Sequence, residues 1–289
     1  MSATLQHQAQ ELGALLPPLL IEAERVAAVV MQGVHGRRRA GIGETFWQFR
    51  RYEQGDPAER IDWRQSSRTD KIFIREREWE AAQSAYVWAD TSGSMQYSSH
   101  KKLPTKAERA QLLMLSLASL LLRGGEKVTW LDRRKITAHG KHGLENIVVR
   151  MGSFKGDSLP PDIPIARHAQ VILCSDFLMP PDVLQNLLRR YAALQLRGVM
   201  LHILDPLENN FALEGRIEIE GCEGETSLLV PNAASLREPY QQRMAAHKEN
   251  LARTAKGAGW HYMQHVTNTL PHIPLMQLYE NLADGQRSL

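Results

Sequence analysis

The sequence has few cysteines, and this scarcity narrows where the protein is expected to work. Only Cys174 and Cys222 occur among 289 residues, and Cys174 lies within an apolar run, where a buried thiol is the ordinary state. Two cysteines do not indicate the disulfide framework of a secreted domain. The first residues also lack the basic and then apolar layout of a signal peptide. We therefore expect a protein of the reducing cytoplasm.

Long hydrophobic runs and an excess of one charge are missing as well. The longest apolar stretch, Leu112–Leu122, is about half of what a membrane-spanning helix needs, so we expect no membrane insertion. The 35 basic and 32 acidic residues give a net charge of +3, which is too mild to indicate nucleic-acid binding. With 43% hydrophobic and 23% charged residues, the composition is that of an ordinary soluble globular protein.

Several catalytic and metal-binding signatures are absent from the sequence. It contains no Gly-x-x-x-x-Gly-Lys-Ser/Thr loop for ATP and no Gly-x-Ser-x-Gly elbow of an α/β-hydrolase. His261 and His265 are four residues apart, but their segment is predicted to be a strand, on which this spacing spans about 13 Å. That distance is too long for both side chains to hold one ion.

The chain is divided into three stretches without a flexible linker or an internal repeat. Residues 1–35 have apolar residues at helical spacing, and residues 36–80 form an arginine-rich block with strand-like runs and turn signals. Residues 81–289 are predicted to form an α/β domain, with an extension of strands and helices from about residue 207. We therefore expect a small helical segment, a β-rich module and one larger domain.

Strand-like and helical patterns alternate from residue 83 to about residue 206. The strand-like runs are 85–89, 127–131, 135–138, 170–175 and 199–204, and the helical patterns are 105–123, 144–151 and 181–197. Such alternation predicts a doubly wound α/β fold, with a mostly parallel sheet between helices. The helix over 105–123 begins with a capping box formed by Thr105 and Glu108.

Acids and hydroxyls follow two of these strands. The run at 85–89 ends at Asp90-Thr91-Ser92-Gly93-Ser94, and the run at 170–175 ends at Asp176. Ligands of open α/β sheets bind beyond the carboxyl ends of the strands, and hard cations such as Mg²⁺ prefer oxygen ligands. The two acids are thus predicted to meet at one ion or polar ligand. Asp176 could alternatively cap a turn or the helix that begins nearby.

The Asp-x-Ser-x-Ser loop with a later strand-end aspartate resembles the metal-ion-dependent adhesion site of von Willebrand factor A domains. The resemblance implies that Ser92 and Ser94 ligate Mg²⁺ or Mn²⁺, with Asp90 and Asp176 acting directly or through water. A carboxylate from a partner protein would then complete the octahedron. The threonine that usually supplies a fifth ligand is absent between 138 and 170. Ser158 is our first choice in its place, and Ser153 is the second.

The upstream block narrows the resemblance to one family. It reads Gly41-x-Gly43-Glu44-x-Phe46-Trp47-x-Phe49-Arg50-x-Tyr52-x-x-Gly55-Asp56, then Arg60-Ile61-Asp62-Trp63-Arg64, then Ile72-x-Ile74-Arg75-Glu76. This pattern resembles the domain-of-unknown-function family 58 (DUF58), which carries such a block just before an A-domain metal site. The resemblance implies a MoxR-type AAA+ ATPase as partner and a chaperone-like role.

The arginines of the block alternate with acids, which favours internal ion pairs and a rigid β-rich module. A basic recognition face for an acidic partner is the alternative, whereas nucleic acid is disfavoured because the nearby acids would repel phosphate. We therefore expect a non-enzymatic, cytoplasmic interaction module with a Mg²⁺-type site. The alternatives are a metal-dependent hydrolase that uses the same acids and a metal-free scaffold with a degenerate site. The sequence does not determine the oligomeric state.

Overall fold

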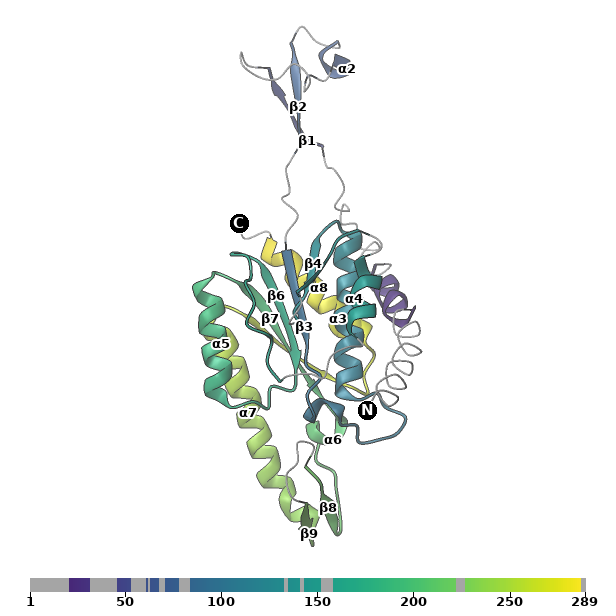
Figure 1. The fold of residues 1–289 in the computed structure, drawn as a ribbon, viewed down its shortest axis with the longest axis vertical. Coiled ribbons are helices and arrows are strands. Elements are labelled where there is room, and N and C mark those ends of the chain that lie inside the picture. The colour runs from purple at the N-terminus through teal and green to yellow at the C-terminus, as the bar shows by residue number, and fades with distance from the viewer. Residues whose placement is uncertain are drawn as a thin grey trace, which may run out of the picture.

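A six-stranded sheet forms the centre of the molecule (Figure 1). The computed structural model describes residues 21–31, 46–52, 61, 63–67, 71–77, 84–132, 135–140, 143–151, 158–221 and 227–286. The strand order is β10-β7-β6-β3-β4-β5, and every neighbouring pair is parallel except β4 and β5. The strands are β3 (Ser84–Ala89), β4 (Lys127–Trp130), β5 (Ile136–Ala138), β6 (Gln170–Ser175), β7 (Arg197–Leu204) and β10 (His261–Val266). The predicted α/β class with a mostly parallel sheet is confirmed.

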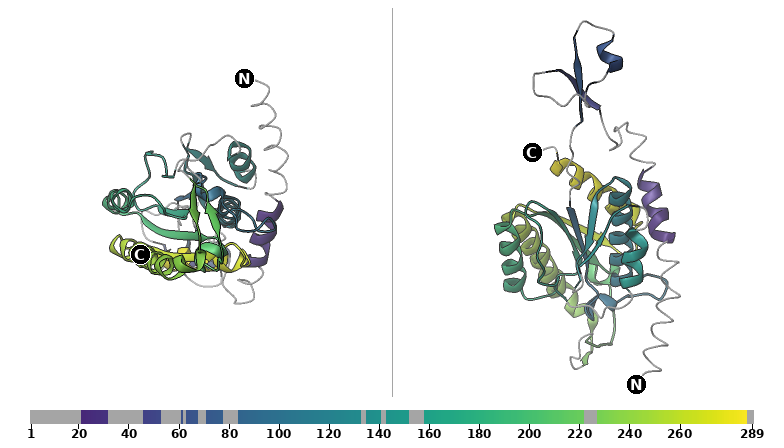
Figure 2. Two further views of the ribbon diagram at one scale, coloured as in Figure 1. Left: turned by 90° about the horizontal axis from the view of Figure 1, so that it is seen from below. Right: turned by 45° about the horizontal axis from the view of Figure 1, so that its top comes forward.

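Helices cover both faces of this sheet (Figure 2). The described part of one face packs against the helix at residues 21–31, α3 (Lys106–Arg123), α4 (Gly143–Met151) and α8 (His272–Gln286). The other face packs against α5 (Pro181–Ala193) and α7 (Arg237–Gly257). The molecule therefore has three layers, with a separate apolar core on each side of the sheet.

Strand β3 shows how the sequence pattern builds the two cores. Its side chains alternate between the faces, as the period of a strand requires. Ala85, Val87 and Ala89 join the core beneath α3, whereas Tyr86 and Trp88 join the core beneath α5. Because both faces are covered, the strand is apolar throughout rather than alternating with polar residues.

The position of β3 in the sheet defines the region beyond the carboxyl ends of β3 and β6, which we term the crevice. The chain passes from β3 to β4 on one side and later returns to β6 on the other side of β3. The strand order therefore reverses between β3 and β6, and ligands of open α/β sheets bind outside the carboxyl ends of such strands. Asp90 and Asp176 follow these two strands directly.

The helix predicted over 181–197 is shorter than expected, because α5 ends at Ala193. Gln195 has a φ of 56°, and its N–H donates to the Ala192 carbonyl at 2.9 Å. The Leu196 N–H donates to the Tyr191 carbonyl at 3.1 Å, so the helix closes with the paired hydrogen bonds of a Schellman motif. The sequence did not predict this helix end, because the left-handed position is occupied by Gln195 and not by the glycine that usually marks it. Strand β7 consequently begins at Arg197, two residues before the predicted start.

The structure describes the amino-terminal part of the chain in several short pieces. Residues 21–31 are helical, and Ala23, Val26, Ala27 and Val30 from this helix are buried against α3 and its neighbours. Within the arginine-rich block, β1 (Phe46–Arg51) pairs with β2 (Phe73–Arg77) in antiparallel fashion, and α2 (Trp63–Ser66) lies between them in sequence. Among the arginine side chains of the block, that of Arg64 is exposed.

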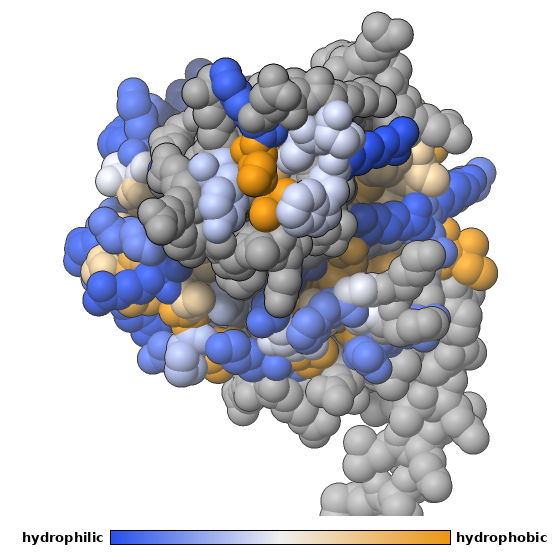
Figure 3. Space-filling model, turned by 90° about the horizontal axis from the view of Figure 1, so that it is seen from above, coloured by the Kyte–Doolittle hydropathy of each residue, from blue (hydrophilic) through white to orange (hydrophobic). Residues whose placement is uncertain are grey.

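The arginine-rich block exposes Tyr52, Trp63 and Ile72. The face drawn in Figure 3 combines a small hydrophobic area with surrounding hydrophilic residues.

The segment after β7 carries α6 (Pro206–Asn209), the pair β8 (Ile217–Ile219) and β9 (Leu228–Val230), and a short turn of helix, η3 (Ala233–Leu236). The β8–β9 pair projects from the same end of the sheet as α6 (Figure 1) and exposes Ile219, Leu228 and Leu229. None of the described helices is long and apolar enough to cross a membrane.

Candidate functional site

Asp90 is held rigidly where β3 meets β6. Its N–H donates to the Cys174 carbonyl at 2.9 Å, which extends the strand ladder by one bond. The carboxyl group is buried: Oδ1 accepts from the Ser92 N–H at 2.8 Å, and Oδ2 accepts from the Ser175 hydroxyl at 2.6 Å. Burial raises the pKa of Asp90, whereas the bonds from Ser175 and Ser92 lower it. The bonds from Ser92 and Ser175 together hold the carboxyl group in one orientation.

The two serines of the loop converge on one another. Their hydroxyl oxygens, Ser92 Oγ and Ser94 Oγ, lie 3.3 Å apart. The Met95 N–H donates to the Ser92 carbonyl at 3.2 Å, and the buried Met95 side chain anchors the loop beneath α3. Neighbouring ligands on an octahedral Mg²⁺ ion are separated by about 3 Å when each lies about 2.1 Å from the metal. The spacing of the two hydroxyls thus fits two adjacent coordination positions.

Asp176 lies at the matching end of β6 and is also buried. Its Oδ1 accepts from the Leu178 N–H at 3.2 Å. Asp176 does not cap α5, which begins at Pro181 with Pro180 in the capping position and no side-chain capping bond. It does cap the turn that follows β6 through the bond from the Leu178 N–H, as the alternative role allowed. Between Asp176 and α5, Phe177 is buried with a φ of 52°, a conformation that is costly for a bulky residue. Its N–H donates to Ser175 Oγ at 2.9 Å, so Ser175 links this turn to Asp90.

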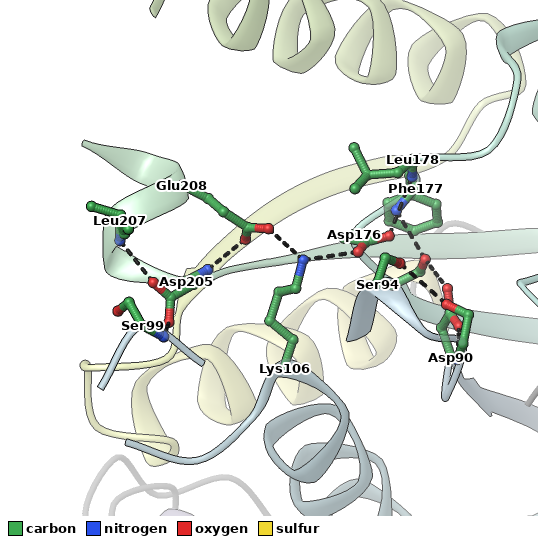
Figure 4. Close-up of polar contacts among 12 residues, drawn as sticks. Asp90, Ser94, Ser99, Lys106, Asp176, Phe177, Leu178, Asp205, Leu207 and Glu208 are labelled. Carbon is green, nitrogen blue, oxygen red and sulfur yellow. Dashed lines mark hydrogen bonds and ion pairs between the residues drawn. The ribbon is translucent and has the colours of Figure 1, made fainter. Parts of the chain in front are cut away.

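Lys106 completes the site and was missed by sequence analysis. It is the first residue of α3 and is 1% exposed. Its Nζ lies 2.9 Å from Asp176 Oδ2 and 2.6 Å from Glu208 Oε1 (Figure 4). Burial by itself lowers the pKa of Lys106, but the attraction of Asp176 and Glu208 outweighs it, and the pKa is raised. The ammonium group is therefore charged at neutral pH.

A third strand end contributes two further acids. Asp205 follows β7 and is fully buried; its Oδ1 accepts from the Leu207 N–H at 2.8 Å and its Oδ2 from the Ser99 N–H at 3.0 Å. Glu208 Oε2 accepts from the Asp205 N–H at 2.9 Å, which forms a capping box at α6. Burial raises the pKa of Glu208, although the charge of Lys106 lowers it. The sequence Asp205-Pro-Leu-Glu208, directly after an apolar strand, was the signal that could have revealed this part.

The ammonium of Lys106 thus lies between the carboxylates of Asp176 and Glu208 (Figure 4). Asp90 and Asp205, at neighbouring strand ends, form their hydrogen bonds with other groups. Among the described residues, no group of three or more His, Cys, Asp or Glu is placed to hold a metal ion. Any ion bound here would have to use the serine hydroxyls together with the acids, as adhesion-type sites do.

The predicted ligands fit such an ion in part. Asp90, Ser92 and Ser94 form one compact group of oxygen donors, whereas Asp176 Oδ2 is engaged by Lys106. Ser158 is exposed, and within the described chain it forms no hydrogen bond with the other predicted ligands. Its role stays a prediction, and Ser153 lies outside the described residues.

The fold and the site define a class: an α/β protein with a mostly parallel sheet, consistent with a Rossmann-like or von Willebrand factor A-like arrangement, and acids at three strand ends. The chain belongs to the family described as Protein of unknown function DUF58, whose sequence profile matches residues 48–250. The predicted membership of DUF58 is thereby confirmed.

Relatives cover most of the chain at low identity. Uncharacterized protein Rv1480 of Mycobacterium tuberculosis and Uncharacterized protein Mb1516 of Mycobacterium bovis are each 23% identical over 265 residues, which span 86% of this chain and 83% of each relative. Among solved structures, the conserved hypothetical protein BatB from Bacteroides thetaiotaomicron is 16% identical with a TM-score of 0.36. An aerotolerance-related membrane protein from Bacteroides fragilis is 12% identical with a TM-score of 0.38. Each covers 70% of this chain and is itself 99% covered. At these TM-scores the two structures support no argument about function.

Proposed function

We propose that the protein is a non-enzymatic interaction module that binds a partner protein at the crevice between Asp90 and Asp176. The observation that carries the proposal is the meeting of the Asp90-x-Ser92-x-Ser94 loop with Asp176 where the strand order reverses. Open α/β sheets bind their ligands at this position. The exposed aliphatic side chains of β8 and β9 lie at the same end of the molecule and offer apolar contact area to a bound partner.

A Mg²⁺ or Mn²⁺ ion is the proposed link to the partner. Ser92, Ser94 and Asp90 would hold it, with Asp176 and a carboxylate of the partner on its other sides. The ion, when bound, supplies a hard Lewis acid with an open position for an Asp or Glu of the partner. The loop, fixed by its bonds to Ser175 and by Met95, keeps the two hydroxyls in place before the partner arrives.

The proposed partner is a MoxR-type AAA+ ATPase, and the proposed role is to adapt or assist its remodelling of other proteins in the cytoplasm. The support for this partner is the family to which the chain belongs, together with the adhesion-like pattern of its strand ends.

Pull-down of a purified MoxR-type ATPase by the immobilised protein tests the proposal. We expect capture in the presence of Mg²⁺, and loss of capture in EDTA and in Asp90→Ala. Asp182→Ala is the matched control, because Asp182 is an exposed acid at the start of α5 outside the crevice. Circular dichroism and thermal melting establish that both variants are folded. Unchanged capture by a folded Asp90→Ala variant would refute the proposal.

A metal-free scaffold is the second candidate, and the Lys106–Asp176 ion pair is the observation that favours it. Here the ammonium takes the place of an external cation, and the partner contacts the crevice without metal. Capture that resists EDTA but is lost in Asp90→Ala would identify this form of the interaction.

A further inference from the structure

We propose that Lys106, which bridges Asp176 and Glu208, competes with the divalent ion for Asp176 and thereby makes metal binding at the site weak and conditional. This inference rests on the proposed metal-assisted function and concerns how the same site is regulated. It begins from a buried lysine that faces a proposed metal ligand directly, with its Nζ 2.9 Å from Asp176 Oδ2.

The ammonium of Lys106 occupies the site only at Asp176. Both oxygens of Asp176 are engaged, Oδ2 by Lys106 and Oδ1 by the Leu178 N–H. A cation that approaches Asp176 therefore meets a positive charge at hydrogen-bond distance from the carboxylate. The hydroxyls of Ser92 and Ser94, in contrast, form their hydrogen bond with each other and not with Lys106. Among Asp90, Ser92, Ser94 and Asp176, the protein's own cation thus holds Asp176, whereas Asp90 accepts from Ser92 and Ser175.

Lys106 also has a second carboxylate partner, Glu208. Glu208 Oε1 lies 2.6 Å from its Nζ, and the other oxygen of Glu208 is fixed by the Asp205 N–H. Asp205 in turn accepts from the Ser99 N–H, so Glu208 is held in position by the loop that leads to α3. When Asp176 turns to a metal ion, Lys106 can keep its bond to Glu208 and does not become an unpaired buried charge. A small movement of the Asp176 side chain away from Lys106 is then sufficient to free its carboxylate for a metal ion.

Lys106 acts inside the protein rather than on the partner. Its side chain is buried, at 1% exposed, and it belongs to the first turn of α3. Since Lys106 Nζ contacts Asp176 and Glu208, its effect on a bound partner would pass through Asp176 and the ion. By adding a ligand to the ion, the partner would favour the state in which Lys106 has left Asp176, so that metal and partner bind together more tightly than either does alone.

Calorimetric titration of the full chain with MnCl₂ and MgCl₂ tests the inference. Lys106→Gln keeps amide donors for the two carboxylates but removes the charge, and Lys106→Arg keeps the charge. We expect Lys106→Gln to bind the metal about tenfold or more tightly than the wild type, whereas Lys106→Arg stays as weak as the wild type. Lys102→Met is the control for overall charge, because Lys102 is exposed on the loop before α3, and we expect it to leave the affinity unchanged.

Glu208→Gln supplies a second measurement that does not depend on replacing Lys106. Without the second carboxylate Lys106 is held by Asp176 alone, and we expect metal binding about tenfold weaker than in the wild type. This variant decides the question if Lys106→Gln does not show a cooperative thermal transition. Unchanged or tighter binding by Glu208→Gln would then overturn the inference.

The outcomes separate this inference from the proposed function. Equal affinities of the wild type and Lys106→Gln would overturn the role of Lys106 and leave the metal site standing. Absence of binding in both proteins at millimolar metal would overturn the inference and also remove the metal from the proposed function. Tighter binding by Lys106→Gln that Asp90→Asn abolishes in the same background supports both.

Discussion

Replacing Lys106 by methionine is the most informative test of what holds the site together. Methionine has a similar length and can fill the same space, but it leaves Asp176 and Glu208 without the ammonium that now lies 2.9 and 2.6 Å away. The side chains of these acids are 4% and 19% exposed, so water replaces the lost charge poorly. Removing one partner of a buried ion pair costs about 3–5 kcal/mol, which we expect here in the absence of metal.

Urea unfolding in EDTA at pH 7 measures this free energy. The fluorescence of the buried Trp88, Trp130 and Trp260 reports the transition, and an unchanged slope against urea concentration establishes that the same structure unfolds. Lys102→Met is the control and should lie within about 0.5 kcal/mol of the wild type, because its side chain is exposed.

A double-mutant cycle then isolates the pair. Asp176→Asn removes the charge that Lys106 neutralises, so the double variant Lys106→Met with Asp176→Asn should be more stable than the sum of the single effects by about 1 kcal/mol or more. A loss below about 1 kcal/mol in Lys106→Met, or strict additivity in the cycle, would refute the reasoning, since either result would mean that solvent already screens this pair.

Three further predictions concern the packing and charge of the surrounding fold, each measured by urea unfolding. Gly198→Ala places a Cβ 2.5 Å from Trp260 Cε3 and 2.6 Å from the Val171 carbonyl, and this clash should lower the free energy of unfolding by about 3 kcal/mol. Gly257→Ala is the control, because its Cβ meets no atom within 4 Å and the change should be neutral or stabilising. Equal effects of the two changes would contradict the clash. Burial, helped by the charge of Arg109, lowers the pKa of His265 from 6.5 to about 4. Between pH 6.5 and pH 4 the unfolded chain therefore binds a proton at His265 that the folded chain does not bind. The free energy of unfolding falls by about 3 kcal/mol as the pH falls across this range. His265→Gln should lack this loss, and an unchanged pH profile in the variant would contradict the lowered pKa of His265. Thr105→Ala removes the capping bond to the Glu108 N–H and should cost about 1 kcal/mol, and no loss would mean that the cap is replaced by water.

Parts of the fold with strong local signals were predictable from the sequence. The run Gln170–Ser175 was predicted as a strand with its observed bounds, and the helix over 105–123 has the predicted capping box at Thr105 and Glu108. The end of α5 was not predictable, because the left-handed position is taken by Gln195 rather than by glycine. There the tertiary fit of Leu196, which is buried beside α5, determines where the helix stops.

The candidate site also has parts that could be predicted from the sequence and parts that could not. The meeting of Asp90 and Asp176 could be predicted, because the carboxyl ends of parallel strands lie at one edge of a sheet and open sheets bind ligands there. Ser158 was chosen for its Gly-Asp-Ser-Leu setting in the loop before β6, and its role as a ligand stays a prediction. Glu208 was missed because it belongs to a four-residue helix without a periodic pattern.

The sequence by itself therefore determined the α/β class, the apolar strands and the acids and hydroxyls at their ends, since each follows from a local pattern and the general geometry of parallel sheets. Only the tertiary structure decided that Lys106 turns inward between Asp176 and Glu208. A lysine at the start of a helix is ordinarily a solvated residue, and nothing in its neighbours along the chain indicates otherwise. The burial of its charge depends on two carboxylates that lie 70 and 102 residues away in sequence and that only the packing of β6, β7 and α3 brings within hydrogen-bond distance.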